Sequence, residues 1–311
     1  MTNAQLIDWL LQGDVSIRFQ TLRDLSGKTE ISLQKRIATE GWGKQFLALR
    51  NANGYWGKSF YQPKWTSTHY TMLDLKLLGI SPELPALRET AEHILAHEKS
   101  SDGGINPART VINSDVCVNG MVMNYACYFG VNENGLHSVV DFLLEQAMPD
   151  GGFNCQSNQH GAVHSSLHTT LSVLEGILEY ESNGYTYRLP ELKRAAKTSR
   201  EFILIHRLFR SDKTGKIIRP EFLRLYYPTR WFYDILRALD YFRAANIRYD
   251  KRMQDAIDVL LEKRMETGQW KLPAKHPGLV HFEMEKAGEA SRWNTLRAMR
   301  VLQHFGKLPK A

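Results

Sequence analysis

Residues 102–106, Asp102-Gly103-Gly104-Ile105-Asn106, recur in nearly the same form as Asp150-Gly151-Gly152-Phe153-Asn154. Each phrase precedes a predicted helix whose first residues include side chains that bind metals. The first helix opens with Ser114-Asp115-Val116-Cys117, and the second opens with His164-Ser165-Ser166-Leu167-His168. The two segments occupy the same position in successive copies of a repeat. If these copies pack side by side, Asp115, Cys117 and His168 converge on one point.

The glycine turn recurs beyond these two copies. Similar phrases begin at Gly54, Gly103, Gly151, Gly215 and Gly268, at intervals of 49, 48, 64 and 53 residues. A period of about 50 residues with helix–turn–helix content is the signature of a repeat architecture. Glycine provides the positive φ that such a turn needs. The sequence therefore predicts helix pairs that stack on one another.

Helical periodicity dominates the chain, and strict alternation of apolar and polar residues is rare. We expect twelve helices in six pairs, at residues 3–11, 15–25, 31–50, 66–78, 84–98, 114–129, 136–147, 162–180, 190–208, 228–244, 250–265 and 288–305. Residues 16–23 resemble residues 290–297, and matching ends favour a repeat that closes into a ring. The prediction is an all-α fold, an α/α toroid formed by residues 1–311 as a single domain. The helices after each glycine turn would form its inner ring.

The charge balance permits an anionic partner. The 311 residues include 40 Lys and Arg against 33 Asp and Glu, a net charge of +7. No run of Lys and Arg is dense enough to predict a nucleic-acid-binding arm. The basic residues form either a solvated surface or a basic cavity.

Cysteine content and hydropathy indicate a compartment. Three cysteines, Cys117, Cys127 and Cys155, do not make a disulfide framework and favour a reducing environment. The N-terminal residues have no basic region ahead of an apolar stretch, so they do not read as a signal peptide. No uninterrupted apolar stretch reaches about 18 residues, so we expect no membrane-spanning helix. The prediction is a cytoplasmic protein, with peripheral membrane contact left open.

Asp115, Cys117 and His168 are suitable ligands for Zn²⁺. A carboxylate, a thiolate and an imidazole all bind zinc, and three protein ligands leave a fourth position open. The start of a helix also favours the thiolate form of a cysteine. His164 lies one turn before His168 and is a rival ligand or a supporting partner. The alternative is structural: a buried cysteine, an N-capping aspartate and two interior histidines.

The glycine turns, and the phrase MPDGGFN ahead of HSSLHTTLSVLEGI, resemble the terpene cyclase and protein prenyltransferase superfamily. The site is similar to that of the protein prenyltransferase β subunits. The resemblance implies that Asp115, Cys117 and His168 hold a catalytic Zn²⁺. It also implies that Arg109 contacts a prenyl diphosphate. It covers residues 50–305 as repeats and is specific over residues 102–178.

This chain departs from the family pattern at two positions. Ile112 and Val118 stand where the family has a lysine and a tyrosine that help to hold the diphosphate. The family also works with a helical-repeat partner subunit, and nothing in this sequence identifies one. The departures put the leaving-group chemistry in doubt.

Aromatic and basic residues near the predicted inner-helix starts are candidates for substrate binding. Aromatic side chains could line a cavity for an isoprenoid or stabilise a carbocation, and arginines could bind phosphate. The alternatives are helix packing and ordinary ion pairs. The candidates are Trp65, Tyr70, Trp231, Trp293, Arg230 and Arg292.

Three functions follow from these observations. The first is a zinc-dependent prenyltransferase-like enzyme that acts on an isoprenoid, or on another apolar substrate with an anionic head, in the central cavity of the toroid. The second is a metal-free toroid enzyme that acts on a terpenoid or a carbohydrate through carboxylates. The third is a toroid that binds a ligand without catalysis. Metal content separates the first function from the other two.

Overall fold

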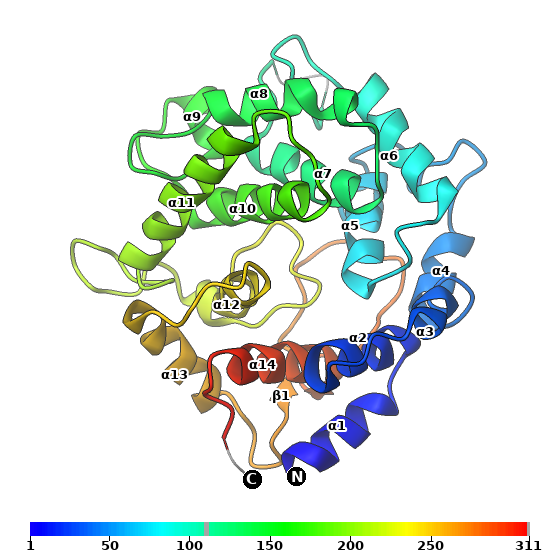
Figure 1. Ribbon diagram of the computed structural model, residues 1–311, viewed down its shortest axis with the longest axis vertical. Coiled ribbons are helices and arrows are strands. Elements are labelled where there is room, and N and C mark those ends of the chain that lie inside the picture. Colours follow the sequence, from blue (N-terminus) through cyan, green and yellow to red (C-terminus); the bar gives the residue numbers. More distant parts are fainter. Residues whose placement is uncertain (109–111, 310–311) are drawn as a thin grey trace. The chain divides into compact units, whose positions relative to one another are not determined.

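The computed structural model describes residues 1–108 and 112–309 and confirms that the chain is mostly helical (Figure 1). The chain divides into two compact units. Unit 1 comprises Met1–Leu49, Leu77–Ser81 and Ile205–Ala311, and unit 2 comprises Arg50–Lys76 and Pro82–Leu204. The single toroid domain stays a prediction.

Unit 2 is organised around two helices whose backbones touch. Its elements are η1 (Lys64–Thr66), most of α5 (Thr68–Leu78), α6 (Pro85–His97), α7 (Val116–Tyr128), η2 (Glu133–Leu136), α8 (His137–Glu145), α9 (Cys155–His160), α10 (Leu167–Ser182) and α11 (Leu189–Ile205). Helices α7 and α10 lie side by side (Figure 1). A Cβ atom added at Gly120 would lie 2.7 Å from the carbonyl oxygen of Ser172, and one at Gly176 would collide with the carbonyl oxygen of Gly120. Glycine at both positions therefore allows the close crossing.

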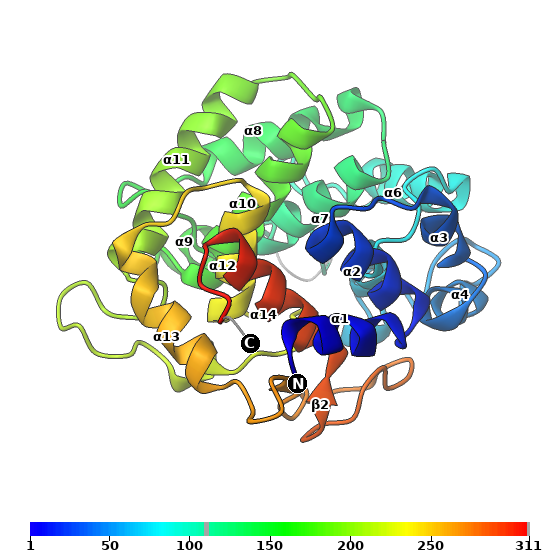
Figure 2. The same ribbon diagram turned by 60° about the horizontal axis from the view of Figure 1, so that its bottom comes forward.

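Unit 1 brings the two ends of the chain together. Its elements are α1 (Asn3–Leu11), α2 (Val15–Ser26), α3 (Ile31–Arg36), α4 (Gly41–Ala48), η3 (Pro220–Leu223), α12 (Ile235–Ala244), η4 (Lys251–Met253), α13 (Gln254–Glu262), β1 (Trp270–Lys271), β2 (Ala290–Ser291) and α14 (Arg292–His304). Helix α2 packs against α14 (Figure 2). The side-chain amide of Asn3 donates to the carbonyl oxygen of Pro309 at 2.9 Å. The first and last helices thus share one core.

The glycine turns are built in the same way in four copies. Gly54, Gly103, Gly151 and Gly268 all have φ between 82° and 96°. In each copy the backbone N–H two residues after the glycine donates to a side chain at the start of the following helix. The four bonds run from Trp56 to Thr68, from Ile105 to Asn119, from Phe153 to Thr170 and from Trp270 to Thr295, at 2.7–3.1 Å. This shared bond gives the sequence repeat a structural basis.

Several predicted helix boundaries are wrong. The helix expected at residues 31–50 is divided into α3 and α4, because Gly41, the first residue of α4, adopts φ +57°. The helix expected at 228–244 begins only at Ile235, because Arg230 has φ +56° and Asp234 forms the N-cap of α12. The helix expected at 288–305 begins at Arg292, because Ala290–Ser291 pairs with β1 as a strand.

Two further boundaries differ in unit 2. The helix expected at residues 162–180 begins at Leu167, where Ser166 is the extended N-cap residue. A short helix that was not expected, α9, occupies residues 155–160 and is capped by the side chain of Asn154. Side-chain caps of this kind satisfy backbone N–H groups that have no partner inside the helix.

A buried ion network joins α2, α12 and α14 in unit 1. The guanidinium of Arg300 donates to Asp24 Oδ2 at 2.7 Å and to Asp240 Oδ1 at 2.9 Å. Burial opposes ionisation of Asp240, but Arg300 and Arg243 outweigh it and hold the pKa of this carboxyl well below its usual range. Both carboxylates therefore remain charged, and each has a cationic partner.

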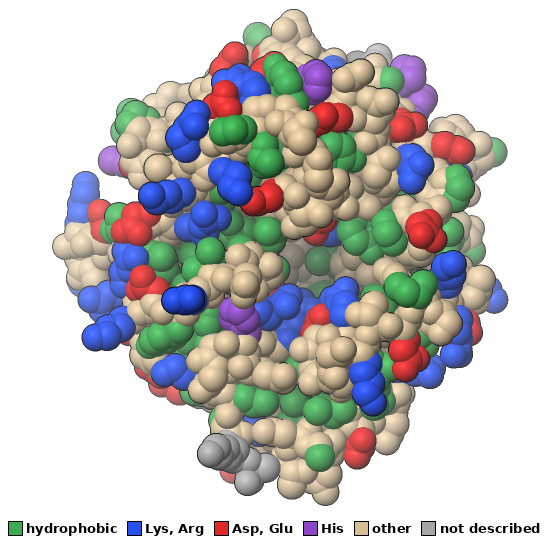
Figure 3. Space-filling model, in the orientation of Figure 1, with side chains coloured by type: hydrophobic (Ala, Val, Ile, Leu, Met, Phe, Trp, Pro, Cys, Tyr) green, Lys and Arg blue, Asp and Glu red, His purple; other side chains and the backbone are tan. Residues whose placement is uncertain are grey.

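The exposed charges of the protein are mixed in sign. On the face shown in Figure 3, Lys and Arg side chains lie among Asp and Glu side chains. Among the described residues, no helix is both long enough and apolar enough to cross a membrane.

The hydrogen bond between the glycine turn and α10 leads to a prediction about stability. Thr170 Oγ1 accepts from the buried Phe153 N–H at 3.0 Å, so Thr170→Val leaves that N–H without its partner. We expect the free energy of unfolding to fall by about 1–3 kcal/mol, measured by urea unfolding. Thr198→Val, on the exposed side of α11, is the matched control and should change it by less than about 0.5 kcal/mol. Equal losses in the two variants would contradict this role of the turn bond.

The environment of Asp234 leads to a prediction about how stability depends on pH. Burial raises the pKa of Asp234 to about 6, although Arg297 and Arg237 oppose the shift. The unfolded carboxyl ionises near pH 4, whereas the folded one stays protonated until about pH 6, so stability should fall as pH rises through this window. Asp234→Asn keeps an N-cap residue and lacks this titration. We expect the variant to gain up to about 3 kcal/mol relative to wild type between about pH 4 and about pH 7. A difference in unfolding free energy that does not change with pH would contradict the raised pKa.

Candidate functional site

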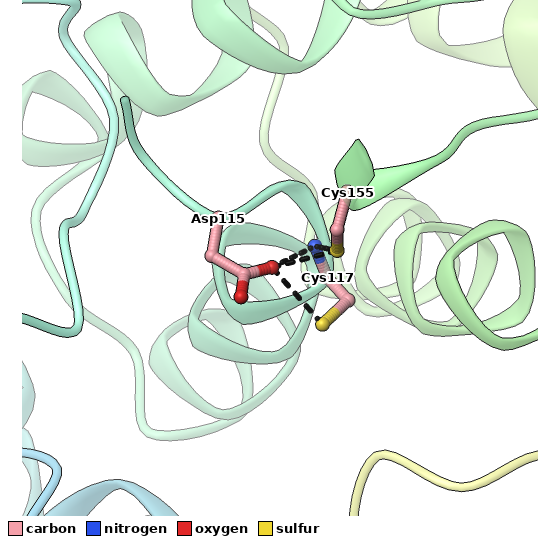
Figure 4. Close-up of side chains that lie close together, drawn as sticks. All are labelled: Asp115, Cys117 and Cys155. Atoms are coloured by element: carbon pink, nitrogen blue, oxygen red, sulfur yellow. Dashed lines mark hydrogen bonds between the residues drawn. The ribbon is translucent and has the colours of Figure 1, made fainter. Parts of the chain in front are cut away.

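Asp115 and Cys117 lie at the start of α7, where the sequence places them. Asp115 is the N-cap, and its Oδ1 accepts from the backbone N–H of Cys117 at 3.2 Å. The thiol of Cys117 donates to the same oxygen at 3.2 Å (Figure 4). Asp115 is half-buried and Cys117 is buried. The N-cap therefore brings a carboxylate and a thiol to one point.

Cys155 is the third member of this group. It is the first residue of α9, and its backbone N–H donates to Thr169 Oγ1 at 3.3 Å. Its thiol donates to Asp115 Oδ1 at 2.6 Å, and its sulfur accepts from the backbone N–H of Cys117 at 3.1 Å. The three side chains point toward one another from the starts of two helices (Figure 4).

Aspartates in the two glycine turns bind the residues just ahead of α7 and α10. Both carboxylate oxygens of Asp102 bind Ser114, one at the backbone N–H and one at the hydroxyl, each at 2.7 Å. Asp150 binds the N–H and hydroxyl of Ser165 in the same way. Asp102 and Asp150 thus anchor residues that lie just ahead of α7 and α10, respectively. This pairing fixes the approach to α7 and to α10.

The group has the chemistry of a cation site. One ligand atom from each of Asp115, Cys117 and Cys155 lies within 4.8 Å of the other two. The hydrogen bond with Cys155, burial and the Asp115 carboxylate together raise the pKa of the Cys117 thiol well above its usual range. The Cys117 thiol therefore stays protonated and donates to Asp115. Two sulfurs and one carboxylate oxygen are a donor set that fits Zn²⁺, whose binding would displace the thiol protons.

A cluster of aromatic side chains lies beside this group in unit 2. Trp65 and Tyr70 belong to it, with ring centroids 4.8 Å apart, and the Tyr61 hydroxyl lies 2.9 Å from that of Tyr70. Burial raises the pKa of Tyr61, and Cys117 and Asp115 add to the shift, so the phenol is electrostatically coupled to the ligand group. Burial also lowers the pKa of His69 to about 3, so this imidazole is neutral. The cluster is therefore aromatic and uncharged, with the hydroxyls of Tyr61 and Tyr70 as polar groups.

The predicted histidines do not belong to the group of three. Among the described residues, the group consists of Asp115, Cys117 and Cys155. His168 is the half-buried second residue of α10, and it is the next residue, Thr169, that contacts Cys155. His164 is exposed, and its carbonyl oxygen accepts from Asn154. Metal binding by His168 stays a prediction. Arg109 lies outside the described residues.

The other substrate-binding candidates lie in unit 1. Trp293 is buried at the start of α14 and stacks on Tyr227 with ring centroids 4.5 Å apart. Arg292 lies over the ring of Trp9 and donates to its carbonyl oxygen at 3.2 Å. Trp231 stacks on Phe232 at 4.0 Å. Arg230 is half-buried. Burial of His276 and of His281 lowers the pKa of each imidazole to about 4, and the charge of Arg230 adds to both shifts.

Sequence reasoning missed Cys155 and Tyr61. The signal for Cys155 was its position directly after Asp150-Gly151-Gly152-Phe153-Asn154, with Asn154 as a possible N-cap. The bond between its backbone and Thr169 could not be read from local pattern. Tyr61 gave no signal, because it lies in a loop ahead of η1.

No protein-family model matches the chain, and a search of curated proteins also gives no match. The site must therefore be interpreted from its own geometry and from the residues that resemble the prenyltransferase pattern.

The proximity of the Cys117 and Cys155 sulfurs leads to a prediction about oxidation. Hydrogen peroxide should convert the two thiols to a Cys117–Cys155 disulfide, because both sulfurs contact one carboxylate oxygen. Each peroxide accepts two electrons and, with the two thiol protons, leaves as two waters. Peptide mapping without reductant should show this cross-link in wild type and in Cys127→Ala, because Cys127 lies elsewhere in α7 and is fully buried. Cross-links that involve Cys127, or both site thiols still open to alkylation after oxidation, would contradict the arrangement.

Proposed function

We propose that this chain is a zinc-dependent transferase of the prenyltransferase type, built as an α/α toroid of six helix pairs. Its substrate is an isoprenoid or another apolar molecule with an anionic head. The observation that carries the proposal is the convergence of Asp115, Cys117 and Cys155, with ligand atoms within 4.8 Å of one another.

Two of the three ligands, Asp115 and Cys117, are residues that the resemblance assigns to the metal, and Cys155 takes the place in the group that the resemblance gives to His168. Asp115 and Cys117 open α7, and Cys155 is held by the first turn of α10 through Thr169. Three protein ligands leave a fourth zinc position for a substrate or for His168. Bound zinc would supply Lewis acidity and favour the thiolate form of an acceptor thiol.

The chain's own residues would bind and shield an apolar substrate. Trp65, Tyr70 and Tyr61 form an aromatic wall beside the ligand group, which suits an isoprenoid chain and excludes water. The phenols of Tyr61 and Tyr70 remain neutral, since burial raises the pKa of both. They can therefore donate hydrogen bonds to an anionic head without repelling it.

The remaining parts of the proposal rest on composition and repeat structure. The shared turn-to-helix bond in four copies supports a closed repeat. The three cysteines are free, which supports a reducing compartment such as the cytoplasm. The net charge of +7 favours an anionic substrate. The identity of a partner subunit is not part of the proposal.

Zinc content tests the metal site. We expect one zinc per chain in wild type and in the matched control Cys127→Ala, measured by metal analysis after dialysis against zinc. Cys117→Ala and Cys155→Ala should each weaken zinc binding by at least about tenfold, because each removes a thiolate ligand. His168→Ala shows whether the histidine completes the shell.

Transfer activity tests the reaction. Zinc-loaded wild type, given prenyl diphosphates of several chain lengths and a thiol peptide, should form a thioether and release diphosphate. Cys117→Ala should form neither product. Wild type that stays free of metal after zinc addition would overturn the metal site. A loaded protein that releases no diphosphate would overturn the transferase assignment alone.

A further inference from the structure

Unit 1 contains a cavity that the proposed reaction does not use. Its volume is about 500 Å³, within the range of about 300–1,000 Å³ that is typical of small-ligand pockets. The strand β1 forms one wall through Trp270 and Lys271, and Leu272, the residue after β1, continues it. Trp270 belongs to the last copy of the glycine turn, so the repeat itself shapes this cavity.

The inner surface of the cavity is apolar. Leu225 and Leu272 are buried side chains of the lining, and Met265 and Pro273 complete it. The indole N–H of Trp270, which could have made the floor polar, donates to the carbonyl oxygen of Leu260 at 2.7 Å. The floor therefore offers hydrophobic contact and no unsatisfied indole donor.

The polar side chains of the lining are cations. Arg224, Lys263 and Lys271 are all exposed, and no carboxylate is among the described residues that line the cavity. The guanidinium of Arg224 donates to the hydroxyl of Tyr226 at 3.4 Å. The pKa of Arg224 is raised by Tyr226 and, to a smaller extent, by the nearby carboxylate of Glu221. Neither lysine has an ion-pair partner within the described ranges. Three positive charges thus surround an apolar floor.

We propose that this cavity binds a small amphiphile that has one anionic head and one apolar chain. The head would lie among Arg224, Lys263 and Lys271, and the chain would lie against Leu225, Met265 and Leu272. Charge complementarity selects the anion, and burial of the chain provides affinity that a free anion lacks. The proposal does not depend on zinc or on transferase activity.

The lining of the cavity favours a ligand that has both an anionic head and an apolar chain. A free phosphate would contact only the exposed cations, whose charge is screened by salt. An uncharged alcohol would fill the floor and leave the three cations without a counter-ion. Affinity should therefore need the head and the chain together.

Decyl phosphate below its aggregation threshold is the probe, with binding measured by isothermal titration calorimetry on the full chain. We expect one saturable site in unit 1, with octyl phosphate about tenfold weaker because two methylenes are lost. Decanol and inorganic phosphate should each bind at least about tenfold more weakly than decyl phosphate.

Three variants locate the site. Lys263→Glu/Lys271→Glu should weaken decyl phosphate binding at least about tenfold. The matched control Lys213→Glu/Lys216→Glu makes the same change in net charge at exposed positions outside the cavity and should keep wild-type affinity. Ala274→Trp, at an exposed lining position, should block the cavity without a change in charge. Thermal unfolding of each variant confirms that it is folded.

The outcomes separate this proposal from the zinc proposal. Decyl phosphate binding that is lost in the cavity variants and retained in Cys117→Ala supports the cavity, whether or not zinc binds. Binding that survives both cavity variants, or no saturable binding to wild type, would overturn the proposal. Inorganic phosphate that binds as tightly as decyl phosphate would also overturn it, because the apolar floor would then contribute nothing.

Discussion

One hydrogen bond, from a glycine turn to a side chain near the start of a later helix, recurs in four copies along this chain. After the glycine, the chain turns back, and a backbone N–H is held by a threonine or an asparagine among the first four residues of α5, α7, α10 or α14. A buried N–H without a partner is costly, so the bond fixes the turn relative to the helix. Cys155 follows its turn directly, whereas Asp115 and Cys117 lie just ahead of Asn119, the residue in α7 that holds the turn.

The ligand group illustrates how two repeats build one site. The first copy supplies Asp115 and Cys117, and the second supplies Cys155, which follows its turn directly. Asp115 Oδ1 accepts hydrogen bonds from both thiols and from the backbone N–H of Cys117. In the proposed zinc site, this oxygen and the two sulfurs would bind the cation once the thiol protons leave. Metal–ligand bonds would then replace the hydrogen bonds of the thiols.

The repeat was predictable because its signals are local. Glycine spacing and apolar periodicity predicted the helical fold, and Asp115 followed from N-cap preference. Cys155 was not predictable, because its position depends on Thr169 and Asp115, which are distant in sequence. The start of the helix expected at residues 228–244 was wrong for a different reason. Arg230 adopts a left-handed backbone, and the capping carboxylate of Asp234 starts α12 later.

The contact between Gly120 and Gly176 has a consequence for how this protein can change. Since no side chain separates α7 from α10 there, their spacing is set by backbone atoms alone. The start of helix α7 carries Asp115 and Cys117, and α10 carries Thr169, which holds the backbone of Cys155. An inserted residue between Cys117 and Gly120 would rotate Asp115 and Cys117 by about 100° around the axis of α7 relative to Cys155. A change in length at this point would therefore separate the three side chains, because the close crossing at Gly120 fixes the position of α7 against α10.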